Sequence, residues 1–162
     1  IYLIGMAGVA VIPGIQAPAA AASEPPKAPN FALKNIQGKP VTLSQLKYKV
    51  AIINFWATWC PPCRAEIPDF VDFYKTYHKK GLEIIGISVD QSAAPVRDFV
   101  KEFGVNYPMV MATPDVIQAY GDIKGIPTSF ILDSKGRIVA KYIGFRPREI
   151  FEKDIRSGLG LK

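Results

Sequence analysis

Two cysteines carry the most reactive chemistry in this sequence. Cys60 and Cys63 are the only cysteines among 162 residues, and Pro61 and Pro62 separate them. A thiol pair at this spacing can cycle between dithiol and disulfide, which would make it a redox centre. An inert disulfide is an alternative, although so short a loop constrains the unfolded chain little. A metal site is another, but such sites usually take four ligands and the chain has one histidine, His78.

The residues on either side of the cysteines predict the elements that hold them. Residues 50–56 are continuously apolar and rich in β-branched and aromatic side chains, which is typical of a buried strand. Apolar residues then recur at helical spacing, which predicts a helix from residue 61 to about residue 79, kinked at Pro68 and ended by Gly81. The pair therefore lies at a helix N-terminus, where free amides and the helix dipole favour a thiolate.

The remaining segments predict a sheet with helices packed on its faces. Residues 31–33 and 40–43 indicate a small hairpin, followed by a helical turn that Ser44 caps. A closing helix at residues 147–159 should turn Ile150, Phe151 and Ile155 inward. Further strands are expected at residues 82–89, 107–111, 128–132 and 138–142, with helices ending at Gly104 and Gly121. This order predicts an α/β fold with a mixed sheet.

The N-terminal residues differ in composition from the rest of the chain. Residues 1–22 contain no charged side chain, and their apolar run and small alanines are typical of a signal peptide remnant, or alternatively of a membrane anchor. Residues 23–29 form a proline-rich linker, and residues 30–162 form the domain. The net charge of +6 is spread along the chain, so we expect a basic surface and no nucleic-acid partner.

Further motifs accompany the cysteine pair. Residues 54–63 read Asn-Phe-Trp-Ala-Thr-Trp-Cys-Pro-Pro-Cys, Glu66 and Pro68 follow, and residues 125–128 read Gly-Ile-Pro-Thr. In this order they resemble the thioredoxin superfamily, and within it the TlpA/ResA-like branch of extracytoplasmic thiol-disulfide oxidoreductases. The resemblance runs from about Pro29 to the C-terminus. It implies a thioredoxin-like fold, in which helices flank a central mixed β-sheet, with an N-terminal β-hairpin extension and an inserted helix.

The resemblance also implies roles for individual residues. Cys60 would be the attacking, solvent-facing cysteine, and Cys63 the buried resolving cysteine. Pro127 would be a cis-proline that faces the dithiol and offers backbone to the substrate. The residues expected to contact the substrate are Trp59, Pro61, Pro62, Ile126 and Thr128, whereas Trp56 is expected in the core.

Glu66 is the candidate proton acceptor. It lies one helical turn after Cys63, so the two side chains can be neighbours. Similar TlpA/ResA-like proteins use a glutamate here for proton transfer. Ordinary thioredoxins place a buried acid just before the Phe-Trp pair, where this chain has Asn54, which cannot titrate. The alternative is a solvated surface carboxylate, although Asp69 and Phe70 offer it no cation three or four residues on.

The same residues predict the direction of electron flow. Pro61 and Pro62 lack N–H groups, and a charged Glu66 opposes a thiolate, so the disulfide should be stable and the protein reducing. Arg64 acts in the opposite direction. We therefore expect a monomeric reductase of protein disulfides in the bacterial periplasm or on the outer face of the cytoplasmic membrane. Apocytochrome c is an example of its substrates, and a membrane thiol-reducing partner would supply electrons.

No cofactor beyond the Cys60–Cys63 disulfide and no metal are expected. A general oxidase or isomerase is the nearest alternative. A peroxiredoxin-like peroxidase is less favoured, because those proteins place proline and threonine before their cysteine, where this chain has Ile53 and Ala57. A copper chaperone is also less favoured, because its relatives separate their cysteines by three residues and add a histidine ligand.

Overall fold

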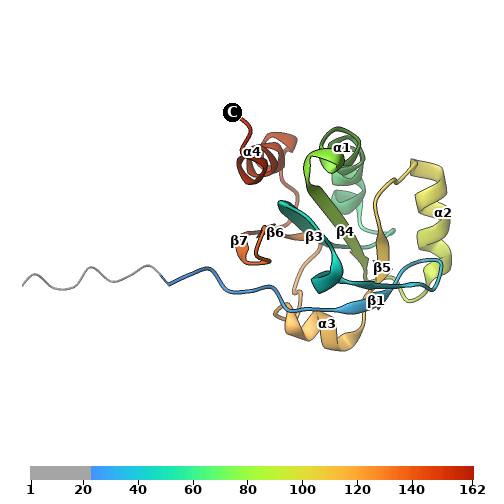
Figure 1. The fold of residues 1–162 in the computed structure, drawn as a ribbon. Coiled ribbons are helices and arrows are strands. Elements are labelled where there is room, and N and C mark those ends of the chain that lie inside the picture. Colours follow the sequence, from blue (N-terminus) through green and yellow to red (C-terminus); the bar gives the residue numbers. More distant parts are fainter. Residues whose placement is uncertain (1–22) are drawn as a thin grey trace, which may run out of the picture.

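The computed structural model describes residues 23–162 (Figure 1). The proposed signal peptide or anchor at residues 1–22 lies outside the described residues. The elements in chain order are β1 (Ala32–Lys34), β2 (Pro40–Thr42), η1 (Leu43–Gln45), β3 (Val50–Trp56), α1 (Pro61–Tyr77), η2 (His78–Lys80), β4 (Leu82–Ser88), α2 (Ala93–Phe103), β5 (Met109–Met111), α3 (Pro114–Ala119), β6 (Thr128–Asp133), β7 (Ile138–Ile143) and α4 (Arg148–Leu159).

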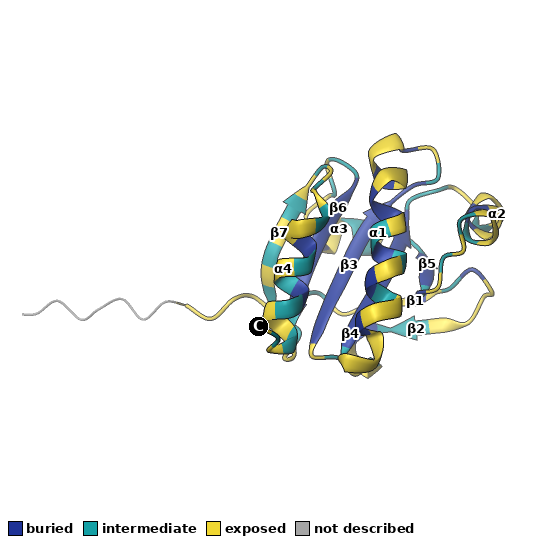
Figure 2. Ribbon diagram, turned by 90° about the horizontal axis from the view of Figure 1, so that it is seen from above, coloured by how far each residue is buried: buried dark blue, intermediate teal, exposed yellow. Residues whose placement is uncertain are grey.

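Five strands form the central sheet, in the order β5-β4-β3-β6-β7. β3, β4 and β5 run parallel to one another, whereas β6 pairs antiparallel with both β3 and β7. The predicted mixed sheet is therefore confirmed. Every residue of β3 and β4 is buried, as Figure 2 shows, because both faces of the sheet are covered. Such strands form rigid supports for the loops at their ends.

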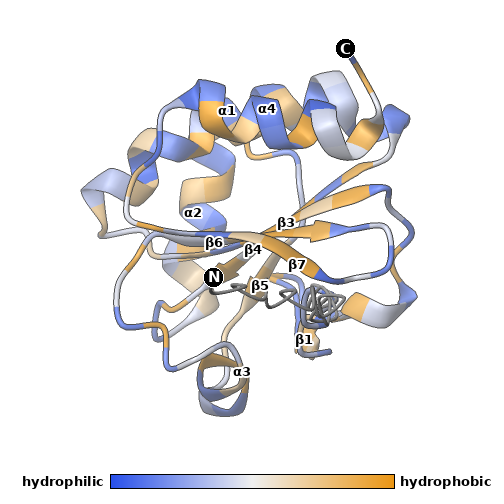
Figure 3. Cartoon of the chain, turned by 90° about the vertical axis from the view of Figure 1, so that its left-hand side faces the viewer, coloured by the Kyte–Doolittle hydropathy of each residue, from blue (hydrophilic) through white to orange (hydrophobic). Residues whose placement is uncertain are grey.

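The two faces of the sheet are packed by different elements. α1 and α4 cover one face and α3 lies below the other (Figure 3). Ile52 and Trp56 of β3 belong to the core cluster with α1, α2 and α4. Ile53 and Phe55 belong to the cluster on the opposite side, since side chains alternate along a strand. Trp56 is fully buried, as predicted.

The N-terminal hairpin extends one edge of the fold. β1 and β2 pair antiparallel, and an isolated bridge joins Asn35 to Val110 of β5. The prediction that Ser44 caps the following turn is wrong. η1 begins after Thr42 without any side-chain cap, and the Ser44 amide donates instead to Asn30 Oδ1 at 2.9 Å. A side chain from outside the turn has replaced the local cap.

Two helices differ in detail from the prediction. α1 ends at Tyr77, and the chain continues as the 3₁₀ turn η2 before Gly81, which has a φ of 115°. In α4, Phe151 is buried but Ile150 is 37% exposed, so the inward placement of Ile150 is wrong. Successive helical residues point about 100° apart, and Ile155 shares the stripe of Phe151 rather than that of Ile150. Within residues 23–162, no helix is long and apolar enough to cross a membrane.

Candidate active site

The dithiol lies where β3 leads into α1. Cys60 is the N-cap of α1, in an extended conformation, and is joined to Cys63 by a disulfide. The Cys63 amide donates to Cys60 Sγ at 3.3 Å. Pro61 and Pro62 occupy the first two helical positions and have no N–H to donate. One helix amide, that of Cys63, therefore donates to the Cys60 sulfur. A helix start without the two prolines would offer further amide donors.

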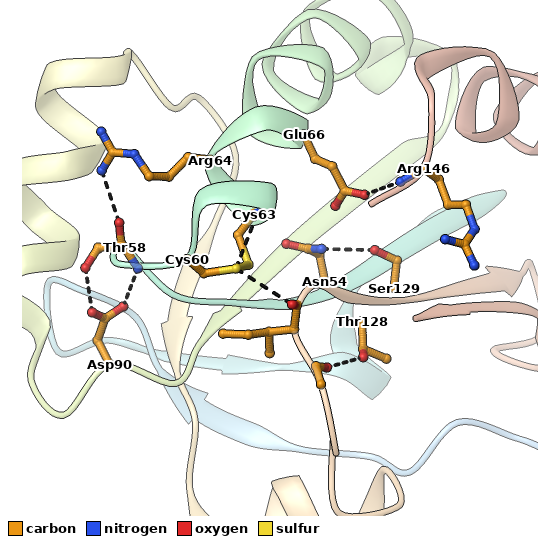
Figure 4. Close-up of a disulfide and its surroundings, with 12 residues drawn as sticks. Asn54, Thr58, Cys60, Cys63, Arg64, Glu66, Asp90, Thr128, Ser129 and Arg146 are labelled. Atoms are coloured by element: carbon orange, nitrogen blue, oxygen red, sulfur yellow. Dashed lines mark hydrogen bonds between the residues drawn. A yellow bond between two sulfur atoms is a disulfide. The ribbon is translucent and has the colours of Figure 1, made fainter. Parts of the chain in front are cut away.

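The two sulfurs are both recessed. Cys63 is 1% exposed and Cys60 is 4% exposed, so the expectation of a solvent-facing Cys60 holds only in the sense that it is the more open of the two. The carbonyl oxygen of Ile126 lies 3.7 Å from Cys60 Sγ (Figure 4). The sulfur carries no proton in the disulfide, but a reduced Cys60 thiol at this position can donate to that carbonyl.

Residues 125–128 form the turn that faces the dithiol. The Ile126–Pro127 peptide bond is cis, as predicted. The Pro127 carbonyl already accepts from the Gly144 amide at 2.7 Å, so the backbone group presented to the sulfur belongs to Ile126 instead. Thr128 is buried, and its hydroxyl donates to the Gly125 carbonyl at 2.5 Å. Thr128 therefore shapes the turn through its side chain, and its contact with substrate stays a prediction.

An apolar hollow lies beside this turn. Its volume is about 260 Å³, and Trp59 and Ile126 are among its walls, together with Val89 and Ile123. Trp59 is 66% exposed, which is unusual for a side chain of its size. Pro61 and Pro62 are also exposed next to the disulfide. The surface around the sulfurs is therefore apolar and open, although the sulfurs themselves are not.

Glu66 is buried on the inner side of α1. It is 2% exposed, so the interpretation as a solvated surface carboxylate is wrong. Its Oε1 accepts from the Arg146 amide at 2.8 Å, and its Oε2 is buried without a partner. Burial raises the pKa of Glu66 to about 7; the amide and charge of Arg146 offset part of this effect, and Asp69 adds to it. A carboxyl group with this pKa can take up or release a proton near neutral pH.

Two buried polar groups lie near this carboxyl group. Asn54 is 2% exposed and donates to Ser129 Oγ at 2.9 Å, so the position of the thioredoxin acid holds a neutral, bonded amide. The Tyr107 hydroxyl is buried without a partner, and its pKa is raised by burial and by the charge of Glu66. The sequence did not single out Tyr107, because a tyrosine in an apolar run is ordinarily a core residue.

A network that the sequence did not reveal fixes the loop before the dithiol. Asp90, just after β4, accepts from the Thr58 amide at 3.0 Å and from the Thr58 hydroxyl at 2.6 Å. Arg64 donates to the Thr58 carbonyl at 3.1 Å and lies over the rings of Phe99 and Phe103. Arg64 thus points away from the sulfurs in Figure 4. The expected stabilisation of a thiolate by Arg64 is therefore not supported.

Candidate metal ligands do not gather near the dithiol. Within residues 23–162, no group of three or more His, Cys, Asp or Glu side chains is arranged to hold a metal ion. His78 lies beyond the far end of α1, where its Nδ1 is 3.0 Å from the Leu82 carbonyl and its ring stacks on Tyr74. Oxidation and reduction of the two sulfurs is the chemistry that the arrangement supports.

Comparisons with known proteins point to the same chemistry. The sequence profile of the AhpC/TSA family matches residues 26–141. The thiol-disulfide oxidoreductase ResA of Bacillus subtilis is 41% identical over 123 residues, which cover 75% of this chain and 68% of that protein. ResA of Bacillus anthracis is 37% identical over 127 residues, covering 78% of this chain and 73% of that protein.

Solved structures agree with the sequence comparisons. A thiol:disulfide interchange protein of the thioredoxin family from Chlorobium tepidum has a TM-score of 0.80 and 40% identity, covering 86% of this chain and 100% of that one. StoA from Bacillus subtilis has a TM-score of 0.66 and 30% identity, covering 80% of this chain and 98% of that one. The fold described above is therefore thioredoxin-like.

Proposed function

Since this chain belongs to the AhpC/TSA family, and within it to the ResA-like thiol-disulfide oxidoreductases, we propose that it reduces protein disulfides outside the cytoplasm. Cys60 is the proposed attacking residue and Cys63 the resolving residue. The observation that carries the proposed direction is the start of α1, where two prolines leave the Cys63 amide as the helix donor to the Cys60 sulfur.

The proposed exchange proceeds in two steps. The Cys60 thiolate attacks one sulfur of the substrate disulfide, which forms a mixed disulfide and releases the other substrate sulfur as a thiolate. The Cys63 thiolate then attacks Cys60 Sγ, which forms the Cys60–Cys63 disulfide and frees the second substrate sulfur. The substrate gains two electrons and this protein loses two. The Cys60 thiol releases its proton to solvent and the Cys63 thiol to Glu66, and these two protons balance the two that the substrate thiolates take up. A thiol-bearing partner at the membrane is proposed to restore the dithiol.

Three features favour the reducing direction. A thiolate at Cys60 receives little hydrogen bonding from the helix, because Pro61 and Pro62 have no amide protons. The Arg64 guanidinium is held by Thr58 and two aromatic rings. Glu66, when charged, also opposes a thiolate nearby. A poorly stabilised thiolate favours the disulfide of this protein and hence reduction of its partner.

Glu66 is the proposed proton acceptor for the resolving step. Cys63 is buried, so its thiol needs a base within the protein to become a nucleophile. Glu66 lies one turn further along the same buried face of α1, and its pKa of about 7 suits proton transfer at neutral pH. Asn54, bonded to Ser129, cannot take this role.

The substrate is proposed to be an exposed protein segment. The hollow beside Trp59 and Ile126 would accept apolar side chains that flank the target cysteines, and the exposed prolines extend the same surface. Apocytochrome c before haem attachment is a proposed example. The proposed location, the periplasm or the outer membrane face, rests on the uncharged composition of residues 1–22. No cofactor is proposed to take part besides the redox-active disulfide.

The reduction potential of the dithiol tests this proposal. Equilibration with glutathione or dithiothreitol should give a value near or below that of thioredoxin, about −270 mV. A value near −120 mV, the range of a strong oxidant, would reverse the proposed direction. Mixed disulfides trapped with the Cys63→Ala variant in the native host would identify the substrates. Trapping of small thiols alone, without any protein partner, would contradict the proposed substrate class.

A peroxidase is the second candidate, because the AhpC/TSA profile spans most of the domain. The cysteine environment does not favour it. Ala57 offers no hydroxyl to the site, and Ile53 is buried in the core cluster on the far side of the sheet. Rapid peroxide consumption that Cys60→Ser abolishes would nevertheless establish this activity.

A further inference from the structure

The end of the sheet opposite to the dithiol carries unpaired lysines around a cavity. β3 has seven residues, so about 20 Å of strand separates the dithiol from the residues just before Val50. A cavity of about 560 Å³ lies at that distant end, between the segment that precedes β3 and the β6–β7 turn. Its walls include Lys27, Lys47 and Lys135, together with Leu43 and Tyr48.

More lysines lie at the same end of the sheet as this cavity. Lys49 directly precedes β3, and its amide donates to the Gly81 carbonyl at 2.8 Å, which brings the turn with Lys79 and Lys80 to the same end of the sheet. All these lysines are exposed, as are the three in the cavity walls. Among the salt bridges of residues 23–162, none involves a lysine. The group Lys27, Lys47, Lys49, Lys79, Lys80 and Lys135 is called the basic end below.

The acidic groups of this region do not neutralise the lysines. Asp133 accepts from Arg137 Nε at 2.7 Å and from the backbone amides of Lys135 and Arg137, and Glu24 pairs with the same arginine at 3.1 Å. Glu83 is buried, and its carboxylate accepts from the Ile84 amide. Exposed positive charge therefore dominates the basic end, and Leu43, Leu46 and Tyr48 add apolar surface to the walls of the cavity.

The N-terminal linker joins the domain at this same end. The Pro26 carbonyl accepts from the Ile138 amide at 2.8 Å, and the Ala28 amide donates to the Gly136 carbonyl at 2.9 Å. Residues 23–25 alone separate this fixed point from the uncharged segment of residues 1–22 (Figure 1). Three extended residues span about 10 Å. A bilayer that held the uncharged segment would thus lie directly beside the cavity.

We propose that the basic end docks on an anionic membrane surface, and that the cavity between Lys27, Lys47 and Lys135 takes the phosphate of a phospholipid headgroup. The lysine ammonium groups attract the phosphate, and Leu43 and Leu46 border the glycerol and first acyl carbons. This docking turns the dithiol away from the bilayer, toward protein substrates in solution. It is independent of the direction of electron flow at the dithiol.

Vesicle binding by the full chain tests the proposal. Binding to phosphatidylglycerol–phosphatidylcholine vesicles is compared with binding to phosphatidylcholine alone, so that any contribution of residues 1–22 appears in both. The triple variant K27Q/K47Q/K135Q should lower the anionic preference on the order of 100-fold, since each lysine near such a surface contributes about 1 kcal/mol. The variant K34Q/K39Q/K101Q removes the same charge from exposed positions elsewhere and should change the preference far less. Unaltered disulfide exchange would show that both variants fold.

Several results would overturn the proposal. Equal losses in the two triple variants would mean that net charge alone acts, and equal binding of the unmodified chain to both vesicle types would exclude anionic docking. Occupation of the cavity by glycerol phosphate, without any vesicle preference, would identify a free phosphate as its ligand. Retention on duplex DNA by the lysines, without vesicle preference, would identify a nucleic acid.

The orientation can be tested separately. Both tryptophans, Trp56 and Trp59, lie at the dithiol end of β3. Their fluorescence should be unchanged when the bound vesicles carry nitroxide-labelled headgroups, because the domain thickness separates them from the bilayer. Quenching of this fluorescence would place the dithiol end on the membrane and contradict the proposed orientation.

Discussion

The two halves of α1 hold acidic side chains in opposite ways. Glu66 in the first half is buried, with one oxygen bonded to the Arg146 amide and the other without a partner. Asp69 and Asp72, one and two turns later, are bound by the Arg148 guanidinium, at 3.2 Å for Asp69. The first half keeps a carboxyl group ready to exchange a proton, whereas the second half fixes its carboxylates as ion pairs.

The difference comes from what α4 and the segment before it supply. Arg146 gives Glu66 a backbone amide, which bonds the carboxyl group without adding a full charge beside it. Arg148, two residues later, gives Asp69 and Asp72 its guanidinium, which also lies 4.4 Å from the centre of the Phe73 ring. A carboxyl group on one helix thus acquires either the proposed proton-transfer role or a structural role from a partner about eighty residues away. Four predictions test this division, from the largest expected effect to the smallest.

Loss of the attacking sulfur should give the largest effect. Cys60→Ser removes the nucleophile of the exchange, because a hydroxyl at neutral pH has almost no alkoxide. Disulfide reduction, followed with a protein disulfide substrate and a thiol donor, should fall to the uncatalysed rate. Arg148→Ala, which removes from α4 the ion-pair partner of Asp69 and Asp72 in the second half of α1, should retain its activity. Equal losses in both variants would mean that the two halves do not differ in function.

Neutralising Glu66 should slow the exchange and change its pH dependence. Glu66→Gln keeps the acceptor for the Arg146 amide but removes the titrating group. General-base catalysis contributes roughly 100-fold or more, so the resolving step should slow by about that factor near pH 7. The step near pH 7 in the rate profile should also disappear. Asp72→Asn is the matched control, and it should leave both the rate and the profile unchanged.

The burial of Glu66 should make stability fall as pH rises. Its folded pKa of about 7 exceeds the ordinary value of 4.5, so between these values the folded protein holds a proton that the unfolded chain has released. Glu66 thus contributes up to about 3 kcal/mol to the free energy of unfolding below pH 4.5, and this contribution is lost as the pH rises from 4.5 through 7. Denaturant unfolding of the disulfide form at pH 5 and pH 8 measures the difference. Glu66→Gln should remove most of it, and a persistent slope would assign the effect to other groups.

The sequence predicted the reactive residues better than it predicted the contacts that hold them. Cys60, Cys63 and the cis bond at Pro127 were found because local spacing and a short motif encode them. The Arg146 amide was not found, since a backbone donor carries no side-chain signature and lies eighty residues from Glu66. The contact between Asp90 and Thr58 depends in the same way on the register of β3 against β4.

The errors have a similar origin. Arg64 was expected to act on the sulfurs because it follows Cys63, but the rings of Phe99 and Phe103 on α2 hold it elsewhere. Ile150 was placed in the core on its hydrophobicity alone, although the helix stripe of Phe151 excludes it. Local periodicity predicts which element forms, but the packing of other elements decides where each side chain points.

The ion pairs of the second half of α1 should contribute the smallest of the four effects, and only to stability. Arg148→Ala removes the bonds to Asp69 and Asp72 and the contact with the Phe73 ring, but these groups are partly exposed, so we expect a loss of about 1–2 kcal/mol. The nearby bond from the Tyr77 hydroxyl to Glu152, at 2.7 Å, should keep α1 and α4 joined. Denaturant midpoints measure the loss, and 1 M salt should reduce it because salt screens exposed pairs. The dithiol potential should stay unchanged in this variant. A shifted potential would show that the second half of α1 also tunes the redox site, and the division between the halves would then fail.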